Sequence, residues 1–239
     1  AFRGTDDTLV GWKEDFNMSF ISPVPSQEDA VKYLNDTCSY IRGRLYVGGH
    51  SKGGNLAIYS AINCNKRVKK KIKCVNNDGP GFDISVIKSE EYKSMLPYIR
   101  SIVPENSIVG MLLEHDDDYI IVKSSQTGIM QHDAMSWQVS GPDMVTVRRL
   151  SAQSRRLNRA FSSWISSVDN EKRCEFVETL FGLISSCGVK NLSDISVDRF
   201  KSTREVIKQY ANLDKDSRTL LRSMLLSLTD QIGKARLEK

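Results

Sequence analysis

The stretch YVGGHSKGGNLAIYSA, residues 46–61, decides the fold. An apolar run ends in two glycines, Ser51 follows His50, and two more glycines open a segment typical of a helix. A strand, a sharp turn and a helix in this order would lift a serine hydroxyl above a sheet, where it can act as a nucleophile. The alternative is a glycine-rich phosphate loop or a plain turn. Which interpretation holds depends on the partners that the rest of the chain supplies.

The composition is that of an ordinary globular protein. Of the 239 residues, 40% are hydrophobic and 26% charged. No apolar run approaches the roughly 18 residues of a transmembrane helix, so none is predicted. The five cysteines form no CxxC pair, which favours free thiols in a reducing compartment over a disulfide framework or a zinc site. We therefore expect a cytoplasmic protein.

The net charge of +5 is unevenly distributed, because all of the excess lies in residues 151–239. Such a mild excess is typical of a solvated basic face, with peripheral contact to an anionic membrane as the alternative. The basic run NKRVKKKIK, residues 65–73, contains no interleaved aromatic residue. Nucleic acid is therefore not an expected partner. The sequence does not determine the oligomeric state.

Residues 1–150 alternate between strand-like and helix-like segments, which predicts an α/β fold with a mainly parallel sheet. One helix is expected at 51–63. Another is expected after Ser26, which has capping-box spacing to Asp29. Its apolar residues recur at helical spacing as far as Ile41, and Gly43 is the expected stop. Strands are expected at 44–49, 71–77, 98–103, 108–115 and 119–125.

Beyond residue 150 the pattern is helical only. Apolar stripes recur at helical spacing, at 161–168, 176–184 and 220–232. We predict two parts: a core of residues 1–150, and a helical C-terminal extension of residues 151–239 that packs on it. The opening AFRGT reads as the end of a strand, so the core is expected to lack its N-terminal part.

A nucleophilic serine needs a base, and the chain contains three histidines. His50 sits inside the turn and is expected to point away as a packed residue. His115 is expected in a turn beside three aspartates. His132, in GIMQHDAMSW, follows the last predicted strand, as the base does in the chain order serine, acid, histidine. Asp133 is its neighbour in sequence, and adjacent side chains diverge, so His132 needs an acid from elsewhere.

Two segments resemble class 3 lipases. AFRGTDDTLVGWKEDF, residues 1–16, resembles their F-R-G-[ST] strand end and following W-x-x-D, and GHSKGGNLA, residues 49–57, resembles their G-H-S-x-G-G-x-L-A segment. The chain as a whole is most similar to the Mbeg-like branch of bacterial lipase-like hydrolases, well over residues 1–140 and loosely in the tail. The resemblance implies an α/β-hydrolase-like fold.

The same resemblance implies two roles for the N-terminal segment. Thr5 is the second oxyanion donor, through its hydroxyl and backbone N–H. Arg3 and Asp15 brace this loop by an ion pair. The first oxyanion donor follows from the residues themselves, because the Lys52 backbone N–H opens the helix after Ser51 and has no partner within it.

One position departs from class 3 lipases, whose catalytic aspartate corresponds to Ser107 here. A serine cannot hold an imidazolium by charge, so the acid has moved or the activity is lost. NNDGPGF, residues 76–82, resembles the segment from which pancreatic-type lipases take their acid, which implies Asp78. The other reading of Asp78 is that it organises its turn, which leaves Glu105 and Asp116–Asp118 as alternative acids.

These observations predict a serine esterase or lipase-like hydrolase. Ser51 is its expected nucleophile, His132 its base and Asp78 its acid; Thr5 and Lys52 form the oxyanion hole, and no metal or organic cofactor is required. The expected partner is a small-molecule ester or acyl lipid. The alternatives are a non-catalytic hydrolase-fold scaffold that binds through its tail, and a thioesterase or acyltransferase on the same residues.

Overall fold

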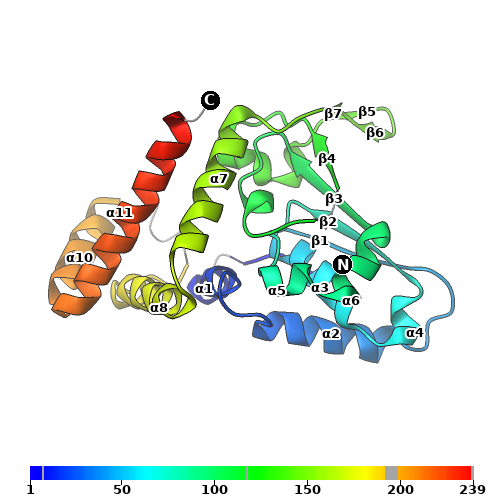
Figure 1. Cartoon of the computed structure of the whole chain (residues 1–239), viewed down its shortest axis with the longest axis horizontal. Coiled ribbons are helices and arrows are strands. Elements are labelled where there is room, and N and C mark those ends of the chain that lie inside the picture. Colours follow the sequence, from blue (N-terminus) through cyan, green and yellow to red (C-terminus); the bar gives the residue numbers. More distant parts are fainter. Residues whose placement is uncertain (7, 117, 192–198, 238–239) are drawn as a thin grey trace.

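The computed structural model describes residues 1–6, 8–116, 118–191 and 199–237. Its central feature is a five-stranded sheet in the order β1-β2-β3-β4-β7, flanked by helices (Figure 1). The strands are β1 (Leu45–His50), β2 (Ile72–Asn77), β3 (Ile99–Pro104), β4 (Tyr119–Val122) and β7 (Thr146–Val147). The first four are mutually parallel and β7 is antiparallel to β4. The predicted mixed fold with a mainly parallel sheet is confirmed.

The chain before the sheet lies against β1. Phe2 forms a single parallel bridge to Gly49, and its backbone N–H donates to the Gly48 carbonyl at 2.8 Å. The segment that follows enters α1 (Leu9–Asn17), which is capped by the Thr8 side chain. These contacts place residues 2–5 beside the turn that ends β1.

The helix after the predicted cap at Ser26 begins slightly earlier than expected. Helix α2 spans Pro25–Cys38, with Val24 as N-cap and the Gln27 side chain accepting from the Val24 N–H at 3.1 Å. Pro25 is a favourable first helical residue, because its missing N–H would have no partner there. The Ser26 N–H donates instead to Glu14, and α2 ends three residues before the exposed Ile41. The Ser26 cap was therefore wrong.

The hydrophobic core lies between the sheet and α3 (Lys52–Asn63). Buried residues of α3 pack on β1 and β2, and they are Ala57, Ile58, Ala61 and Ile62. On the strands, Val47, Ile72 and Cys74 belong to the same cluster. Further short helices contribute residues to the same cluster or pack against it: α4 (Lys66–Lys69), α5 (Ile84–Ile87), α6 (Glu90–Met95) and the 3₁₀ turn η1 (Leu96–Tyr98). Burial of this apolar surface is the main force that fixes α3, and therefore Ser51, against the sheet.

The strand predicted at residues 108–115 does not form. The segment contains a 3₁₀ turn, η2 (Val109–Met111), and one isolated bridge between Glu114 and Phe82. The two edges of β3 are taken by β2 and by β4, so residues 108–115 have no neighbouring strand to pair with. Met111 of this apolar run is instead buried in a cluster with Val103 and Ile121.

The loop after β4 carries His132 and returns the chain to the sheet edge. It contains η3 (Gly128–His132), η4 (Ala134–Ser136) and a small hairpin of β5 (Val139–Ser140) and β6 (Asp143–Met144). Trp137 is buried here and its indole N–H donates to the Gln131 carbonyl at 2.9 Å. That contact ties the loop to the position immediately before His132.

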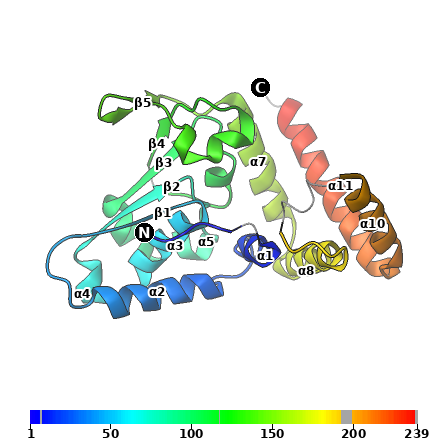
Figure 2. The same cartoon turned by 180° about the vertical axis from the view of Figure 1, so that it is seen from behind.

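The C-terminal part consists of α7 (Ala152–Ser167), α8 (Asn170–Ser186), α10 (Arg199–Asn212) and α11 (Lys215–Leu237). Figures 1 and 2 both show α7 between the sheet and α11, with α1 next to α8. A second apolar cluster joins these helices to α1 through Leu9, Phe176, Phe181 and Met224. Among the described helices, none combines the length and hydrophobicity that a bilayer crossing requires.

Candidate active site

Ser51 occupies the sharp turn between β1 and α3. Its backbone has φ 56° and ψ −135°, a conformation that L-residues rarely adopt and that costs of order 1–3 kcal/mol. The turn is tied to β2 by a hydrogen bond of 2.9 Å from the Ser51 N–H to the Asn77 carbonyl. A strained serine between a strand and a helix N-terminus has the geometry typical of a nucleophile elbow.

The glycines around Ser51 are required by close approach of backbone to backbone. A Cβ on Gly53 would overlap the Phe2 carbonyl, and a Cβ on Gly4 would lie 3.3 Å from the Ser51 Cβ. The N-terminal segment therefore passes directly over the turn that carries Ser51.

Asp78 follows β2, one strand along from Ser51. It is fully buried, at 0% exposure, and has φ 51°, a left-handed conformation that aspartate tolerates better than most residues. Its turn is held by Asn76, which accepts from the Gly79 N–H at 2.9 Å, and by Asn55, whose amide donates to the Pro80 and Gly81 carbonyls. Asn55 lies on α3, so the same helix positions Ser51 and Asp78.

The structure brings His132 and Asp78 together. His132 Nδ1 lies 2.7 Å from Asp78 Oδ2, and the other oxygen, Oδ1, accepts a hydrogen bond of 2.5 Å from the Ser107 hydroxyl. An ionised carboxylate can only accept, so Nδ1 carries the proton and Nε2 is left with a free lone pair. Ser107 does not replace the acid; it is a second partner of the acid.

Ser107 is in turn held by the helical part of the chain. The hydroxyl of Ser154, on α7, donates to the Ser107 carbonyl, and the Ser151 N–H donates to the Glu105 carbonyl at 2.7 Å. Both Ser107 and Ser154 are 1% exposed. Asn106, which lies between Glu105 and Ser107 in the sequence, donates its backbone N–H to the Gln131 side chain at 2.9 Å. The loop at 105–107 thus connects α7 to both the acid and the base.

His50 does not point away from the site, as the sequence had suggested. Its Nε2 lies 2.6 Å from the His132 carbonyl, and the two imidazole ring centroids are 4.5 Å apart. A carbonyl accepts, so His50 carries its proton on Nε2. Burial is the main cause of a lowered pKa for His50, and it is opposed by the hydrogen bond to His132. The residue before Ser51 therefore fixes the loop that carries the base.

Thr5 and Lys52 lie on the two segments that meet at the elbow. In the part of the chain that the structure describes, neither backbone N–H has a hydrogen-bond acceptor. The Thr5 hydroxyl, however, donates to Asp15, so of the two groups predicted for Thr5 only the N–H is available to a ligand. Two such amides beside a strained serine can bind an oxyanion.

The Lys52 side chain has a structural role. It is 6% exposed and its Nζ lies 2.5 Å from Glu14 Oε2 and 3.1 Å from Asp15 Oδ1. The ion pair of Asp15 is therefore with Lys52 and not with Arg3, which corrects the prediction. Burial raises the pKa of Glu14, but hydrogen bonds from Lys52 and Ser26 outweigh it, so the net shift is downward. Burial raises the pKa of Asp15.

The alternative acids lie elsewhere. The backbone of Glu105 is bonded to β4 and to Ser151, the N-cap of α7, and among the described residues no hydrogen bond or ion pair joins Glu105 to His132. Asp116 and Asp118 are exposed, and Asp117 lies outside the described residues. Asp78 is the acid that reaches the imidazole. Sequence reasoning missed the supports of this carboxylate, Ser107, Ser154 and Asn55, because serine and asparagine at those positions carry no pattern.

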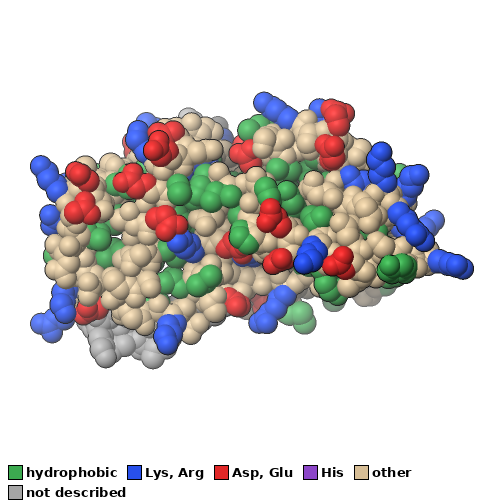
Figure 3. All heavy atoms as spheres, turned by 90° about the horizontal axis from the view of Figure 1, so that it is seen from below, with side chains coloured by type: hydrophobic (Ala, Val, Ile, Leu, Met, Phe, Trp, Pro, Cys, Tyr) green, Lys and Arg blue, Asp and Glu red, His purple; other side chains and the backbone are tan. Residues whose placement is uncertain are grey.

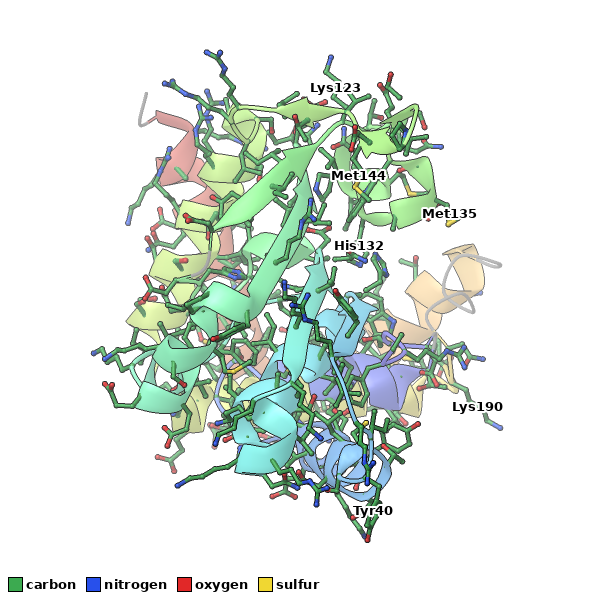
Figure 4. All side chains as sticks on the ribbon, turned by 90° about the vertical axis from the view of Figure 1, so that its right-hand side faces the viewer. Tyr40, Lys123, His132, Met135, Met144 and Lys190 are labelled. Atoms are coloured by element: carbon green, nitrogen blue, oxygen red, sulfur yellow. The ribbon has the colours of Figure 1, made fainter. Side chains whose placement is uncertain are left out.

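Exposed apolar side chains lie on the loop that carries His132. Figure 4 shows His132 beneath the loop that carries Met135 and Met144. On this loop Met135 is 91% exposed, and Ile129, Met130, Val139 and Met144 are also exposed. Exposed apolar groups in this number are typical of a binding surface rather than of a solvated loop.

The family of the chain follows from comparison with known proteins. None of the curated proteins compared with it matches. A family model described as Mbeg1-like matches residues 1–182, which include every site residue above together with α7 and most of α8. The match continues past residue 150, where the sequence suggested a boundary. The chain therefore belongs to the Mbeg1-like family.

Proposed function

We propose that the protein is a serine hydrolase that cleaves carboxylic esters through Ser51, His132 and Asp78. The observation that carries the proposal is the hydrogen bond of 2.7 Å between His132 and a fully buried Asp78, on a loop anchored by the residue next to Ser51. A buried carboxylate bonded to Nδ1 of an imidazole fixes the orientation of the ring and stabilises its protonated form, as a general base requires. The strained backbone of Ser51 supports the same reading.

In the mechanism, His132 Nε2 takes the proton of Ser51 as the serine oxygen attacks the ester carbonyl. Asp78 stabilises the resulting imidazolium, with Ser107 holding the other carboxylate oxygen in place. The N–H groups of Thr5 and Lys52 stabilise the oxyanion. His132 then returns the proton to the leaving alkoxide, and water releases the acyl group by the same steps in reverse order.

The apolar loop around His132 favours substrates with an acyl chain. Met135 and its neighbours offer flexible, polarisable contacts that adapt to chains of different length. This supports an ester of a hydrophobic acid, in the class of acyl lipids, rather than a small polar ester.

The test is labelling by a fluorophosphonate probe, which reacts with activated serines. Wild type is expected to label, whereas Ser51→Ala, His132→Ala and Asp78→Asn should each lose labelling. Ser60→Ala is the matched control, because Ser60 is a buried serine of the same helix whose hydroxyl donates to the Ala57 carbonyl. Its labelling should equal that of wild type. Circular dichroism and thermal melting verify that each variant is folded.

Three outcomes separate the readings. If wild type hydrolyses p-nitrophenyl esters and prefers the longer acyl chains, the proposal stands. If it labels but turns over only acyl thioesters, a thioesterase or acyltransferase on the same residues takes its place. If folded wild type neither labels nor hydrolyses, the chain is a non-catalytic hydrolase-fold scaffold and the proposal is wrong.

A further inference from the structure

Four arginines gather around one groove outside the candidate active site. Arg148 and Arg149 directly follow β7, and Arg155 and Arg159 lie on the first turns of α7, where the chain passes from the sheet to the helices (Figure 1). The groove has a volume of about 740 Å³. A space of that size accommodates a small ligand or a lipid headgroup.

The groove has a rigid apolar floor. Leu150 and Ile121 line it, and both are buried in the same cluster, at 7% and 8% exposure. Arg155 is anchored because its guanidinium donates to the Leu150 carbonyl. The chain bends at Arg148 and Arg149, so that both side chains line the groove instead of alternating across a strand. The fold thus brings four arginine side chains to the lining of one groove.

The described lining of the groove carries more positive than negative charge. Among its described lining residues, Asp118 is the single acidic one. Arg148, Arg149 and Arg155 have no ion-pair partner within the described residues. Elsewhere the surface is mixed, as Figure 3 shows for the lower face, where acidic and basic side chains are interspersed. Clustered cations repel one another, and a bound anion removes that repulsion.

We propose that this groove binds the phosphate group of an anionic ligand. Arginine suits phosphate because its planar guanidinium donates two parallel hydrogen bonds to phosphate oxygens. Asn158 and Tyr119 line the same groove and supply an amide and a hydroxyl as further donors. The phosphate belongs either to a soluble small molecule or to the headgroup of a phospholipid, and both present the same chemistry to the arginines.

This site is separate from the proposed hydrolase site. The groove lies along β4, beginning at its first residue Tyr119, whereas Ser51 and Asp78 follow the carboxyl ends of β1 and β2. None of the groove residues takes part in the hydrogen bonds of His132 or Asp78. Phosphate binding can therefore be tested independently of ester hydrolysis.

The test compares two double variants of exposed arginines. Arg148→Gln/Arg149→Gln removes two groove cations that make no hydrogen bond to other described residues, so the fold should be preserved. Arg42→Gln/Arg44→Gln is the matched control, since both residues are exposed and precede β1. Calorimetry with inorganic pyrophosphate, against sodium chloride of equal ionic strength, tests a soluble ligand. Sedimentation with phosphatidylglycerol vesicles, against phosphatidylcholine vesicles, tests a headgroup.

We expect the groove variant to lose affinity at least about tenfold in one of the two assays, and the control variant to stay within about twofold of wild type. Loss for pyrophosphate alone identifies a soluble phosphate ligand, and loss for vesicles identifies a headgroup. The proposal is overturned if wild type binds neither, or if both double variants lose binding equally, which would show a general charge effect.

Discussion

The Ser107 hydroxyl donates a hydrogen bond of 2.5 Å to Asp78 Oδ1, and Asp78 Oδ2 lies 2.7 Å from His132 Nδ1. Ser107 therefore lies next to Asp78 and does not displace it from His132. Because Asp78 has no contact with solvent, its carboxylate oxygens depend on these protein partners for their hydrogen bonds. The same arrangement ties the acid to α7 through Ser154.

Removing the Ser107 hydroxyl should slow acylation without unfolding the chain. A hydrogen bond to a buried carboxylate contributes about 1.5–3 kcal/mol, which corresponds to roughly a tenfold to hundredfold lower labelling rate for Ser107→Ala. Ser107→Thr retains the hydroxyl and should recover most of the rate. The ester kinetics should show a lower kcat with little change in KM. Equal rates for Ser107→Ala and the Ser60→Ala control would refute a positioning role.

Substitution of Gly110 should separate the acid from the base. A Cβ at this position would overlap Asp78 Oδ1 and lie 2.9 Å from Ser107 Oγ, so Gly110→Ala should displace the carboxylate. We expect labelling to fall by at least about a hundredfold and the free energy of unfolding to fall by about 1–3 kcal/mol.

Gly182→Ala provides the contrast to Gly110→Ala. Gly182 is exposed on α8, and a Cβ there would meet no atom within 4 Å. Alanine is the better helix former, so this variant should gain about 0.5–1 kcal/mol in urea unfolding and label like wild type. A loss of labelling in both glycine variants would mean that the effect at Gly110 is not local.

His50 should make stability depend on pH. Its pKa is lowered in the folded state, chiefly by burial, and the groups that act on it are His132, Asp78 and Asp133. As the pH falls, the unfolded chain therefore binds this proton before the folded chain does. The contribution of His50 to stability is fully present above pH 6.5 and is lost as the pH drops from 6.5 through the folded pKa. The slope due to this proton is at most about 1.4 kcal/mol per pH unit. His50→Gln, which keeps an N–H donor but does not titrate, should lose that part of the slope in urea unfolding between about pH 5 and about pH 7.5, a range that includes the ordinary pKa of 6.5. An unchanged slope would assign the effect to another group.

Lys52 should be important for stability through its side chain. Lys52→Met would leave Glu14 and Asp15 without their buried cation, at an expected cost of about 3–5 kcal/mol in the free energy of unfolding. Lys93→Met removes an exposed lysine paired with Glu90 and should change stability by less than about 0.5 kcal/mol. Urea denaturation of both variants measures the difference, and similar losses would contradict a buried ion pair at Lys52.

Most of the α/β pattern was predictable from the sequence, because it depends on local periodicity. Strands β1, β2 and β3 and helix α3 lie within one residue of the predicted bounds, as expected for apolar runs bounded by glycine and asparagine. Strand β4 begins at the predicted Tyr119 but ends at Val122, three residues earlier than predicted. The helical character of the described part beyond residue 150 was predicted for the same reason. The predicted strand at 108–115 failed because an apolar run does not reveal which segment pairs with β3, and that edge is occupied by β4.

The sequence by itself determined the serine turn, its glycines and the candidate residues His132 and Asp78, since each belongs to a short motif. Only the tertiary structure decided that Asp78 reaches His132, that His50 faces the base, and that Ser107 and Ser154 support the acid. The physical reason is separation along the chain: these hydrogen bonds join residues 29 to 82 positions apart, on strands and loops that meet only when the sheet is formed. A lone serine or asparagine carries no local periodicity, so its partner becomes visible only when the core has folded.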